Sequence, residues 1–229
     1  MLHKKEFLAA FKVSLPIMMG YTVLGFAFGL LVVSFHYPWY LALLMSLFIY
    51  AGALQFLSLT FFSSKLGFLD IFITSIFLNI RQSFYGLSVL KKFKNTKTLK
   101  HYLIFGLTDE TYALLTTLKE NPQLKQKYYY FYLTLLNQSY WVMGTLLGTL
   151  FGSFIEFNTN GLEFSLTALF VVLSLEQYKA NKNVLPFIIG GVASLLAFIS
   201  VPLNNLLICA IVFALLGMFL FKKGLERNG

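Results

Sequence analysis

The stretch that decides the fold is "LGFLDIFITSIFLNIRQSFYGLSVL", residues 66–90, an apolar run with an arginine inside it. The run exceeds the roughly 20 apolar residues that a membrane-spanning helix needs. Arg81 precedes the basic flank at Lys91 by about 15 Å of helix, close to half the hydrocarbon core of a bilayer. An arginine at that depth costs about 2.5 to 3.5 kcal/mol on insertion scales, so we expect it to face a polar partner or a water-filled cavity.

The composition of the whole chain is that of a membrane protein. Of its 229 residues, 58% are hydrophobic, 18% aromatic and only 12% charged, whereas soluble domains carry about 25% charged residues. The mean hydropathy of +0.73 points the same way. We therefore predict an all-α, polytopic integral membrane protein with about six to eight transmembrane helices, some broken or re-entrant. They form a single transmembrane domain over residues 1–229.

The charged residues indicate a bilayer as the partner. A net charge of +9 would suggest nucleic acid in a soluble chain, but nearly all the lysines fall in short loops between apolar segments, so no nucleic-acid partner is expected. The single cysteine and the three histidines form no metal-binding pattern, and we predict neither a metal nor a cofactor. The chain also lacks the Gly-x-Ser-x-Gly, His-Glu-x-x-His and phosphate-loop motifs, which argues against an enzyme or an ATP-driven pump.

Windows of about 19 residues predict the spans. They fall at 13–35, 39–62, 66–90, 128–154, 162–178, 184–202 and 203–221, with a weaker segment at 101–118. The positive-inside rule predicts cytoplasmic N- and C-termini, but three full crossings would leave the basic segment "KKFKNTKTLK" outside. Either 66–90 and 101–118 both dip into the membrane and return, or both cross it. The sequence leaves the two alternatives open.

The residues around Arg81 have two distinct sides if 74–88 is helical. One is an apolar stripe of Ile76, Phe77, Ile80, Phe84 and Leu87, and the other is an arc of Thr74, Ser75, Asn79, Arg81, Gln82, Tyr85, Gly86 and Ser88. Arg81 then either pairs with a buried acid or caps free carbonyls, or it binds an anionic group such as a substrate carboxylate. Both interpretations hold if substrate displaces a resting partner.

A candidate partner occurs in "FGLTDETYALL", residues 105–115. Thr108 followed by Asp109 and Glu110 reads as a helix start, with a hydroxyl cap and acids in the first turn. A helix that begins inside the run 101–118 would be a half-helix of the kind that lines substrate sites in secondary transporters. The alternative is an ordinary helix start at the membrane surface. In the first interpretation, Asp109 or Glu110 meets Arg81, a substrate ammonium or a transported proton.

Three further features are candidates for packing or function. Gln55, in "AGALQF", is an amide that either satisfies a neighbouring helix or contacts substrate. Pro16 lies far from other boundary signals and suggests a functional kink. Glycines at or near four-residue spacing in two spans predict close helix contact: Gly20, Gly25 and Gly29, and Gly144, Gly148 and Gly152. The likeness of these two stretches also suggests an internal repeat.

Five motifs resemble a known family. In order, they are "SLPIMMGYTVLGFAFG", "AGALQF", "NIRQSFYG", "LTDETYALL" and "YWVMGTLLGTLFGS". Between Ser14 and Ser153 the chain resembles the AzlC family, the large subunit of branched-chain amino acid exporters. The resemblance implies a permease of the bacterial inner membrane that works with a small AzlD-type membrane protein. It also implies export of valine, leucine or isoleucine.

One departure from the family bears on the mechanism. The family commonly has Asn-x-Arg-His, whereas this chain has Gln82 after the arginine, so Asp109 and Glu110 are the titratable groups left in the matched motifs. We expect a secondary transporter driven by the proton gradient, with Asp109 or Glu110 at the substrate ammonium and Arg81, Asn79 and Tyr85 at the carboxylate. The rival interpretations are a scaffold subunit that transports nothing by itself and an intramembrane enzyme.

Overall fold

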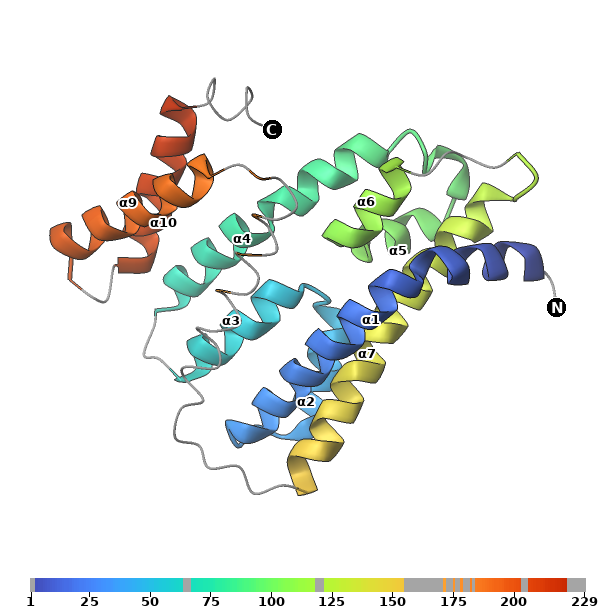
Figure 1. Cartoon of the computed structure of the whole chain (residues 1–229), viewed down its shortest axis with the longest axis horizontal. Coiled ribbons are helices and arrows are strands. Elements are labelled where there is room, and N and C mark those ends of the chain that lie inside the picture. Colours follow the sequence, from blue (N-terminus) through green and yellow to red (C-terminus); the bar gives the residue numbers. More distant parts are fainter. Residues whose placement is uncertain are drawn as a thin grey trace. The chain divides into compact units, whose positions relative to one another are not determined.

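The computed structural model describes residues 3–63, 67–117, 122–154, 184–202 and 206–221, together with Val171, Leu175, Tyr178 and Lys182. The regular structure in these ranges is helical (Figure 1): α1 (Lys4–Ser34), α2 (Trp39–Phe48), α3 (Gly52–Ser63), α4 (Phe68–Val89), the 3-10 helix η1 (Lys94–Thr96), α5 (Leu99–Phe105), α6 (Asp109–Thr117), α7 (Gln126–Phe154), α9 (Leu185–Ser200) and α10 (Leu206–Leu220). The all-α prediction is confirmed. The predicted span 162–178 lies almost wholly outside the described residues.

The chain packs as two compact units. The first is drawn from residues 1–62 and 78–159, and the second from 63–77 and 160–229. In the second unit α9 packs against α10. The first unit contains the candidate residues singled out above, from Pro16 to Gly152, and it is built on α1 and α7.

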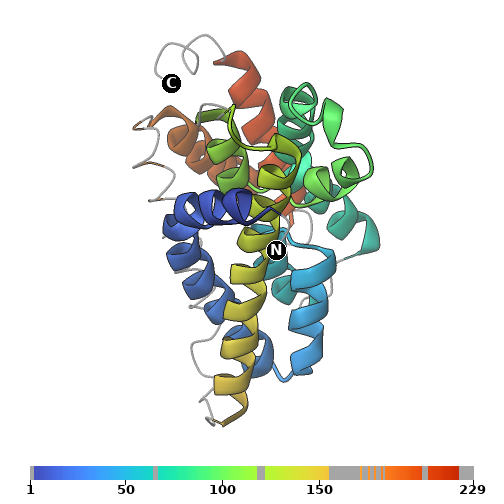
Figure 2. The same cartoon turned by 90° about the vertical axis from the view of Figure 1, so that its right-hand side faces the viewer.

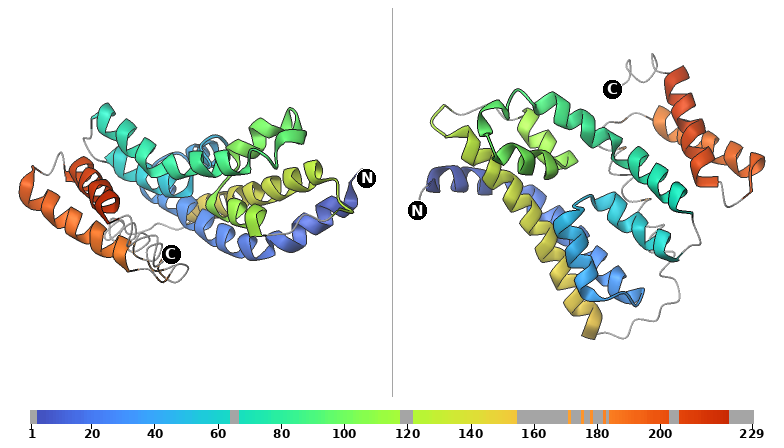
Figure 3. Two further views of the ribbon diagram at one scale, coloured as in Figure 1. Left: turned by 90° about the horizontal axis from the view of Figure 1, so that it is seen from above. Right: turned by 180° about the vertical axis from the view of Figure 1, so that it is seen from behind.

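Helices α1 and α7 run parallel, side by side, as Figures 1, 2 and 3 all show. The contacting pairs advance along both helices in the same direction: Glu6 with Lys125, Ser14 with Tyr140, and Val33 with Gly152. At the shared N-terminal end, the backbone N–H of Lys125 donates to Glu6 Oε1 at 3.1 Å. The starts of α1 and α7 therefore lie at one end of the pair, here called the basic end because Lys4, Lys5, Lys125 and Lys127 lie there.

Glycines allow the backbones of α1 and α7 to touch. A Cβ added to Gly25 or to Gly144 would lie 2.5 Å from a carbonyl oxygen of the facing helix, and Gly29 and Gly148 are tighter still. Any side chain at these four positions would push the helices apart, so the predicted close contact is confirmed for them. Gly152 makes a looser contact with a side chain.

The same prediction is wrong for Gly20, because a Cβ there would meet nothing within 4 Å. Gly20 is exposed, on a side of α1 that does not face α7. Pro16 lies inside α1, which continues through it as one helix. Figures 1 and 3 show that α1 is bent, and Pro16 accounts for a bend because it supplies no backbone N–H to the preceding turn.

The apolar run 39–62 is a hairpin of two half-helices, not the single span that its hydropathy predicted. Helices α2 and α3 are separated at Tyr50, whose φ of 45° is left-handed. The ring of Tyr37, before α2, lies 5.4 Å from the ring of Phe62, at the end of α3. The hairpin thus returns to the end from which it started, beside the C-terminus of α1. Its helices have 10 and 12 residues, about half of what a bilayer requires.

Helix α4 is continuous through 22 residues, about 33 Å. Its last residue, Val89, belongs to a buried cluster with Ala10 of α1 and Leu133 of α7. Between Phe62 and Val89 the chain therefore passes from the far end of the α1–α7 pair to the basic end. The apolar residues of the predicted stripe are largely exposed, as lipid contact requires: Ile76, Ile80, Phe84 and Leu87.

The run 101–118 is a second hairpin, and it opens towards the basic end. Helices α5 and α6 are separated at Gly106–Thr108. Lys92, just after α4, donates a hydrogen bond to the carbonyl of Leu115, near the end of α6. The predicted helix start is confirmed, because the backbone N–H of Thr111 donates to Thr108 Oγ1 at 3.3 Å.

This path differs from both alternatives that the sequence left open. Segments 39–62 and 101–118 are the hairpins, and 66–90 is the long helix between them. The segment 91–100 consequently lies at the basic end, with the starts of α1 and α7. Window hydropathy missed this because an apolar run of given length scores alike whether it is one helix or two half-helices.

By length and composition, α1 is the one described helix that could cross a membrane unaided. Shorter apolar helices occupy Trp39–Phe48, Gly52–Phe62, Leu185–Ser200 and Cys209–Leu220. Large apolar side chains are exposed along α9 and α10, including Ile199 and Phe219. Such a surface is expected where lipid, rather than water, surrounds the protein.

Candidate functional site

The tips of the two hairpins meet beside the middle of α1. Tyr50, at the break between α2 and α3, has its ring 6.4 Å from that of Phe105, at the end of α5. Tyr21, on α1, reaches the other break, with its Oη 2.6 Å from Thr108 Oγ1. Tyr21 and Tyr50 are both buried. Breaks in two helices thus come together in the interior of the first unit, an arrangement found at substrate sites of secondary transporters.

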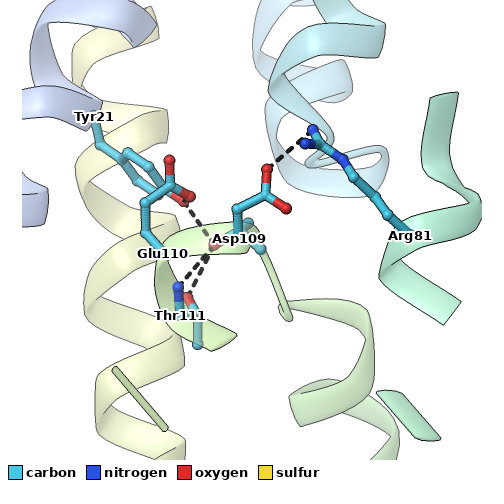
Figure 4. Close-up of polar contacts among 6 residues, drawn as sticks. Tyr21, Arg81, Asp109, Glu110 and Thr111 are labelled. Carbon is cyan, nitrogen blue, oxygen red and sulfur yellow. Dashed lines mark hydrogen bonds and ion pairs between the residues drawn. The ribbon is translucent and has the colours of Figure 1, made fainter. Parts of the chain in front are cut away.

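Arg81 forms an ion pair with Asp109 across this region. Arg81 Nη2 of α4 lies 3.0 Å from Asp109 Oδ2, at the start of α6 (Figure 4). The pair is the one that the sequence predicted as an alternative to Glu110. Both side chains are partly exposed, 44% for Arg81 and 40% for Asp109. A guanidinium has five N–H donors, so the contact through Nη2 leaves most of the planar fork for a second anion.

Glu110 has a different partner from its neighbour. Glu110 Oε2 lies 2.5 Å from Tyr21 Oη, and Figure 4 shows this carboxylate directed to α1 while that of Asp109 is directed to α4. The Tyr21 ring meets Trp141 of α7 edge to face, with centroids 5.6 Å apart. The two acids therefore tie the first turn of α6 to two different helices. That turn suits them electrostatically, because free backbone N–H groups there favour negative charge.

Helix α7 holds both hairpins through two consecutive amides. Asn137 Nδ2 donates to Thr111 Oγ1 at 2.9 Å, which fixes α6. Gln138 accepts from Tyr102 Oη at 2.7 Å, and its Nε2 donates to the carbonyl of Leu47 at 3.1 Å, which fixes α5 and α2 together. Buried amides of this kind commonly stabilise helix contacts within membranes.

The remaining predicted site residues divide into two groups. Gln55 is fully buried and donates to Ser46 Oγ at 3.2 Å, and Ser46 in turn lies 3.0 Å from Thr145 Oγ1 of α7. It therefore satisfies neighbouring helices, which was one of its two interpretations. Asn79, Gln82 and Tyr85 are half-buried on α4, near Arg81 in sequence.

Tyr85 is the best placed of the α4 residues. It interacts electrostatically with both Asp109 and Arg81. Its ring stacks on that of Tyr112, with centroids 4.3 Å apart, and this stack joins α4 to α6.

Sequence reasoning missed several residues that the structure brings to the site: Tyr21, Tyr50, Asn137, Gln138 and Trp141. Asn137 and Gln138 were open to detection, because two adjacent amides in an apolar run carry the signal that singled out Gln55. Tyr21, Tyr50 and Trp141 carried no such signal, since aromatic residues are common throughout this chain.

The comparison with known families decides the classification. Residues 16–155 match the family model described as "AzlC protein". The chain belongs to the AzlC family. The matched residues include the α2–α3 hairpin, the α5–α6 hairpin and the Arg81–Asp109 ion pair, so the whole candidate site lies within the AzlC match.

Curated relatives of this AzlC chain span nearly its whole length. An uncharacterized membrane protein of Helicobacter pylori is 42% identical over 96% of this chain and 99% of the relative. The branched-chain amino acid transport protein AzlC of Bacillus subtilis is 34% identical over 96% of this chain and 87% of the relative. The inner membrane protein YgaZ of Escherichia coli is 28% identical over 93% of this chain. No solved structure matches. Together with its apolar helices, this kinship identifies the AzlC chain as an integral membrane protein.

Proposed function

We propose that this AzlC family member is the large subunit of a secondary transporter that exports branched-chain amino acids across the bacterial cytoplasmic membrane. The observation that carries the proposal is the partly exposed Arg81–Asp109 ion pair at the start of a half-helix, inside an apolar segment of a membrane protein. Charged side chains within membrane segments are costly and are usually retained for function. This ion pair offers a positive and a negative group, which are the two charges that a zwitterionic substrate needs. The Bacillus subtilis relative, a branched-chain amino acid transport protein, supports the substrate class.

The substrate engages the pair by exchange. Its carboxylate takes the planar fork of Arg81, and its ammonium takes Asp109 as that carboxylate is released, so one ion pair is replaced by two. Tyr85 and Asn79 lie on the same helix as Arg81 and contribute hydrogen bonds to the carboxylate, with Gln82 adjacent. Because both members of the resting pair are about two-fifths exposed, exchange does not require a buried charge to be left alone.

Both termini lie in the cytoplasm in this proposal. The basic segment 91–100 and the starts of α1 and α7 share one end of the first unit, and the positive-inside rule places that end in the cytoplasm. The α5–α6 hairpin then enters from the cytoplasmic side and the α2–α3 hairpin from the opposite side. Their tips meet at the site, which suits alternating access.

The transporter takes its energy from the proton gradient and requires a small AzlD-type membrane partner. The acids in the first turn of α6 are carboxyl groups at the site that can take up a proton, and membership of the AzlC family supports the small partner. The proposal makes the chain a carrier rather than an enzyme. The second candidate function, a scaffold subunit that moves nothing, is not favoured, because a scaffold gives no reason for an exposed ion pair at a helix break.

Export of preloaded, labelled valine tests the proposal in cells that express the chain with its small partner. Wild type, Arg81→Ala and Arg81→Lys are compared at matched membrane abundance. We expect export by wild type, a loss of at least tenfold in Arg81→Ala, and a partial loss in Arg81→Lys, which keeps the charge but not the fork. Equal export by wild type and Arg81→Ala would remove Arg81 from the site. If wild type moves no valine, the amino acid assignment is wrong.

A further inference from the structure

A chain of polar atoms runs from Glu110 to the interior face of α7. Glu110 Oε2 lies 2.5 Å from Tyr21 Oη, and Tyr21 Oη lies 2.6 Å from Thr108 Oγ1. Thr108 Oγ1 lies 3.0 Å from Thr111 Oγ1, which accepts from Asn137 Nδ2 at 2.9 Å. The chain passes through α6, α1 and α7, and Figure 4 shows the part around Tyr21 and Thr111.

The hydroxyl hydrogens give this chain a direction when Glu110 is ionised. Tyr21 has one hydroxyl hydrogen and two oxygen neighbours, and it donates to the carboxylate because a charged acceptor makes the stronger bond. The geometry has Tyr21 Oη donating to Thr108 Oγ1 and Thr108 Oγ1 donating to Thr111 Oγ1. With the Tyr21 hydrogen on the carboxylate, the Tyr21–Thr108 contact keeps a hydrogen only if the hydroxyls of Thr108 and Thr111 rotate and donate the other way. The amide nitrogen of Asn137 closes the chain as a donor. After that rotation every hydrogen of the chain points towards Glu110.

A proton on Glu110 reverses this direction. The carboxyl group then donates to Tyr21 Oη, Tyr21 donates to Thr108, and Thr108 donates to Thr111. The hydrogen of Thr111 needs an acceptor, which Asn137 Oδ1 supplies if the amide turns over. Asn137 is fully buried, and its Oδ1 has no hydrogen-bond partner among the described residues. Turning the amide over exchanges Nδ2 and Oδ1, and it brings this unused acceptor to Thr111.

We propose that Glu110 is the group that carries the coupling proton, and that the hydrogen-bond chain through Tyr21, Thr108, Thr111 and Asn137 reverses when it does. The inference rests on the proposed transport function and specifies how that transport is coupled. Because the reversal ends on α7, protonation at Glu110 changes the contact between α6 and the α1–α7 pair. That contact fixes the hairpin whose tip forms the substrate site.

Glu110 suits this task better than Asp109. Asp109 is paired with Arg81, so a proton there would break the ion pair. Glu110 instead faces a hydroxyl that can donate or accept, so it gains or loses a proton while keeping the same neighbour. The ionisable groups around it are Tyr21 of α1, Tyr50 of the α2–α3 break and the paired Asp109, and α7 contributes neutral amides.

Two assays on liposomes containing the chain and its small partner separate coupling from binding. Valine counterflow exchanges labelled for unlabelled substrate with no net proton movement, and an imposed pH gradient drives net movement. We expect Glu110→Gln and Tyr21→Phe to retain counterflow within about threefold and to lose at least tenfold of the gradient-driven movement. Tyr102→Phe is the matched control, because its hydroxyl joins the same hairpin to α7 at 2.7 Å but lies outside the chain. It should keep both activities.

The outcomes distinguish this inference from the proposed function. Gradient-driven movement that survives in Glu110→Gln and Tyr21→Phe overturns the inference and leaves valine transport standing. Loss of counterflow together with gradient-driven movement in both variants also overturns it, because these residues would then serve substrate binding or folding. A further variant, Glu110→Asp, keeps an ionisable carboxyl and should retain part of the response to the gradient. No counterflow by wild type overturns the proposed function itself.

Discussion

Asp109 and Glu110 are consecutive residues whose carboxylates contact side chains of two different helices. Asp109 pairs with Arg81 of α4 at 3.0 Å, and Glu110 contacts Tyr21 of α1 at 2.5 Å. Neighbouring side chains on a helix point about 100° apart, so residues of a single turn can contact two different helices. The half-helix α6 is thereby held between α4 and α1, and a change at either acid alters its position.

The two acids should differ in their dependence on Arg81. In a double-mutant cycle, Arg81→Ala with Asp109→Ala should give a coupling energy of about 1 kcal/mol, modest because both side chains are partly exposed. Arg81→Ala with Glu110→Ala should give a coupling energy near zero. Thermal unfolding of the purified variants in detergent measures both values. Equal coupling of Arg81 to the two acids would contradict the division of partners described here.

The glycines of α1 and α7 offer a test of the contact between these two helices. Gly148→Ala would put a methyl group against the Phe26 carbonyl of the facing helix, so the helices must separate. We expect a large fall in membrane abundance and in unfolding temperature. Gly20→Ala is the control, because a Cβ there meets nothing within 4 Å and alanine favours a helix by about 1 kcal/mol over glycine. Fluorescence-detected size exclusion compares the two, and similar losses would contradict the contact.

Local chemistry explains which parts of the site were readable from sequence. The sequence predicted a helix start at Thr108, Asp109 and Glu110, because a hydroxyl cap and first-turn acids act within a single turn. The sequence also predicted a polar partner for Arg81, because the free energy of placing a charged side chain in lipid is high. The helix start is confirmed by the local hydrogen bond from the Thr111 backbone N–H to Thr108 Oγ1, and the partner by the ion pair of Arg81 with Asp109.

Other parts depended on tertiary contacts and were not readable. The break at Tyr50 has no proline or turn sequence before it. Its left-handed backbone occurs where the Tyr50 side chain is buried and Gly52 lies against the Trp141 ring. Hydropathy averages over such a break, which is why 39–62 was predicted as a single span. Tyr21 was missed for a similar reason, since its role arises only where α6 meets α1.

Gln138 should matter for stability in a way that Gln82 does not. Gln138→Leu removes the acceptor of the Tyr102 hydroxyl and the donor to the Leu47 carbonyl. Each polar group left unpaired costs about 1 to 3 kcal/mol, so the unfolding temperature should fall markedly. Gln82→Leu makes the same substitution on α4, where the side chain is half-buried, and should have little effect. Equal shifts in thermal unfolding would mean that Gln138 does not hold the two hairpins.

Cysteine accessibility should decide the path of the chain between α1 and α7. In a Cys209→Ser background, Gly67→Cys follows the α2–α3 hairpin and Lys97→Cys follows α4. With the basic end in the cytoplasm, as proposed, we expect labelling of position 67 from outside and of position 97 from the cytoplasm, because Phe62 and Val89 lie at opposite ends of the α1–α7 pair. A membrane-impermeant maleimide applied to intact cells and to inverted vesicles measures this.

Each alternative path gives another pattern of labelling. If 66–90 dipped into the membrane and returned, both positions would react from the cytoplasm. If 39–62 and 66–90 were both full crossings, position 67 would react from the cytoplasm and position 97 from outside, with the lysines of 91–100 against the positive-inside rule. The three patterns are mutually exclusive, so two single-cysteine variants suffice. Either alternative pattern would also separate the two hairpin tips, because the α2–α3 break could not then approach the α5–α6 break from the opposite side of the membrane.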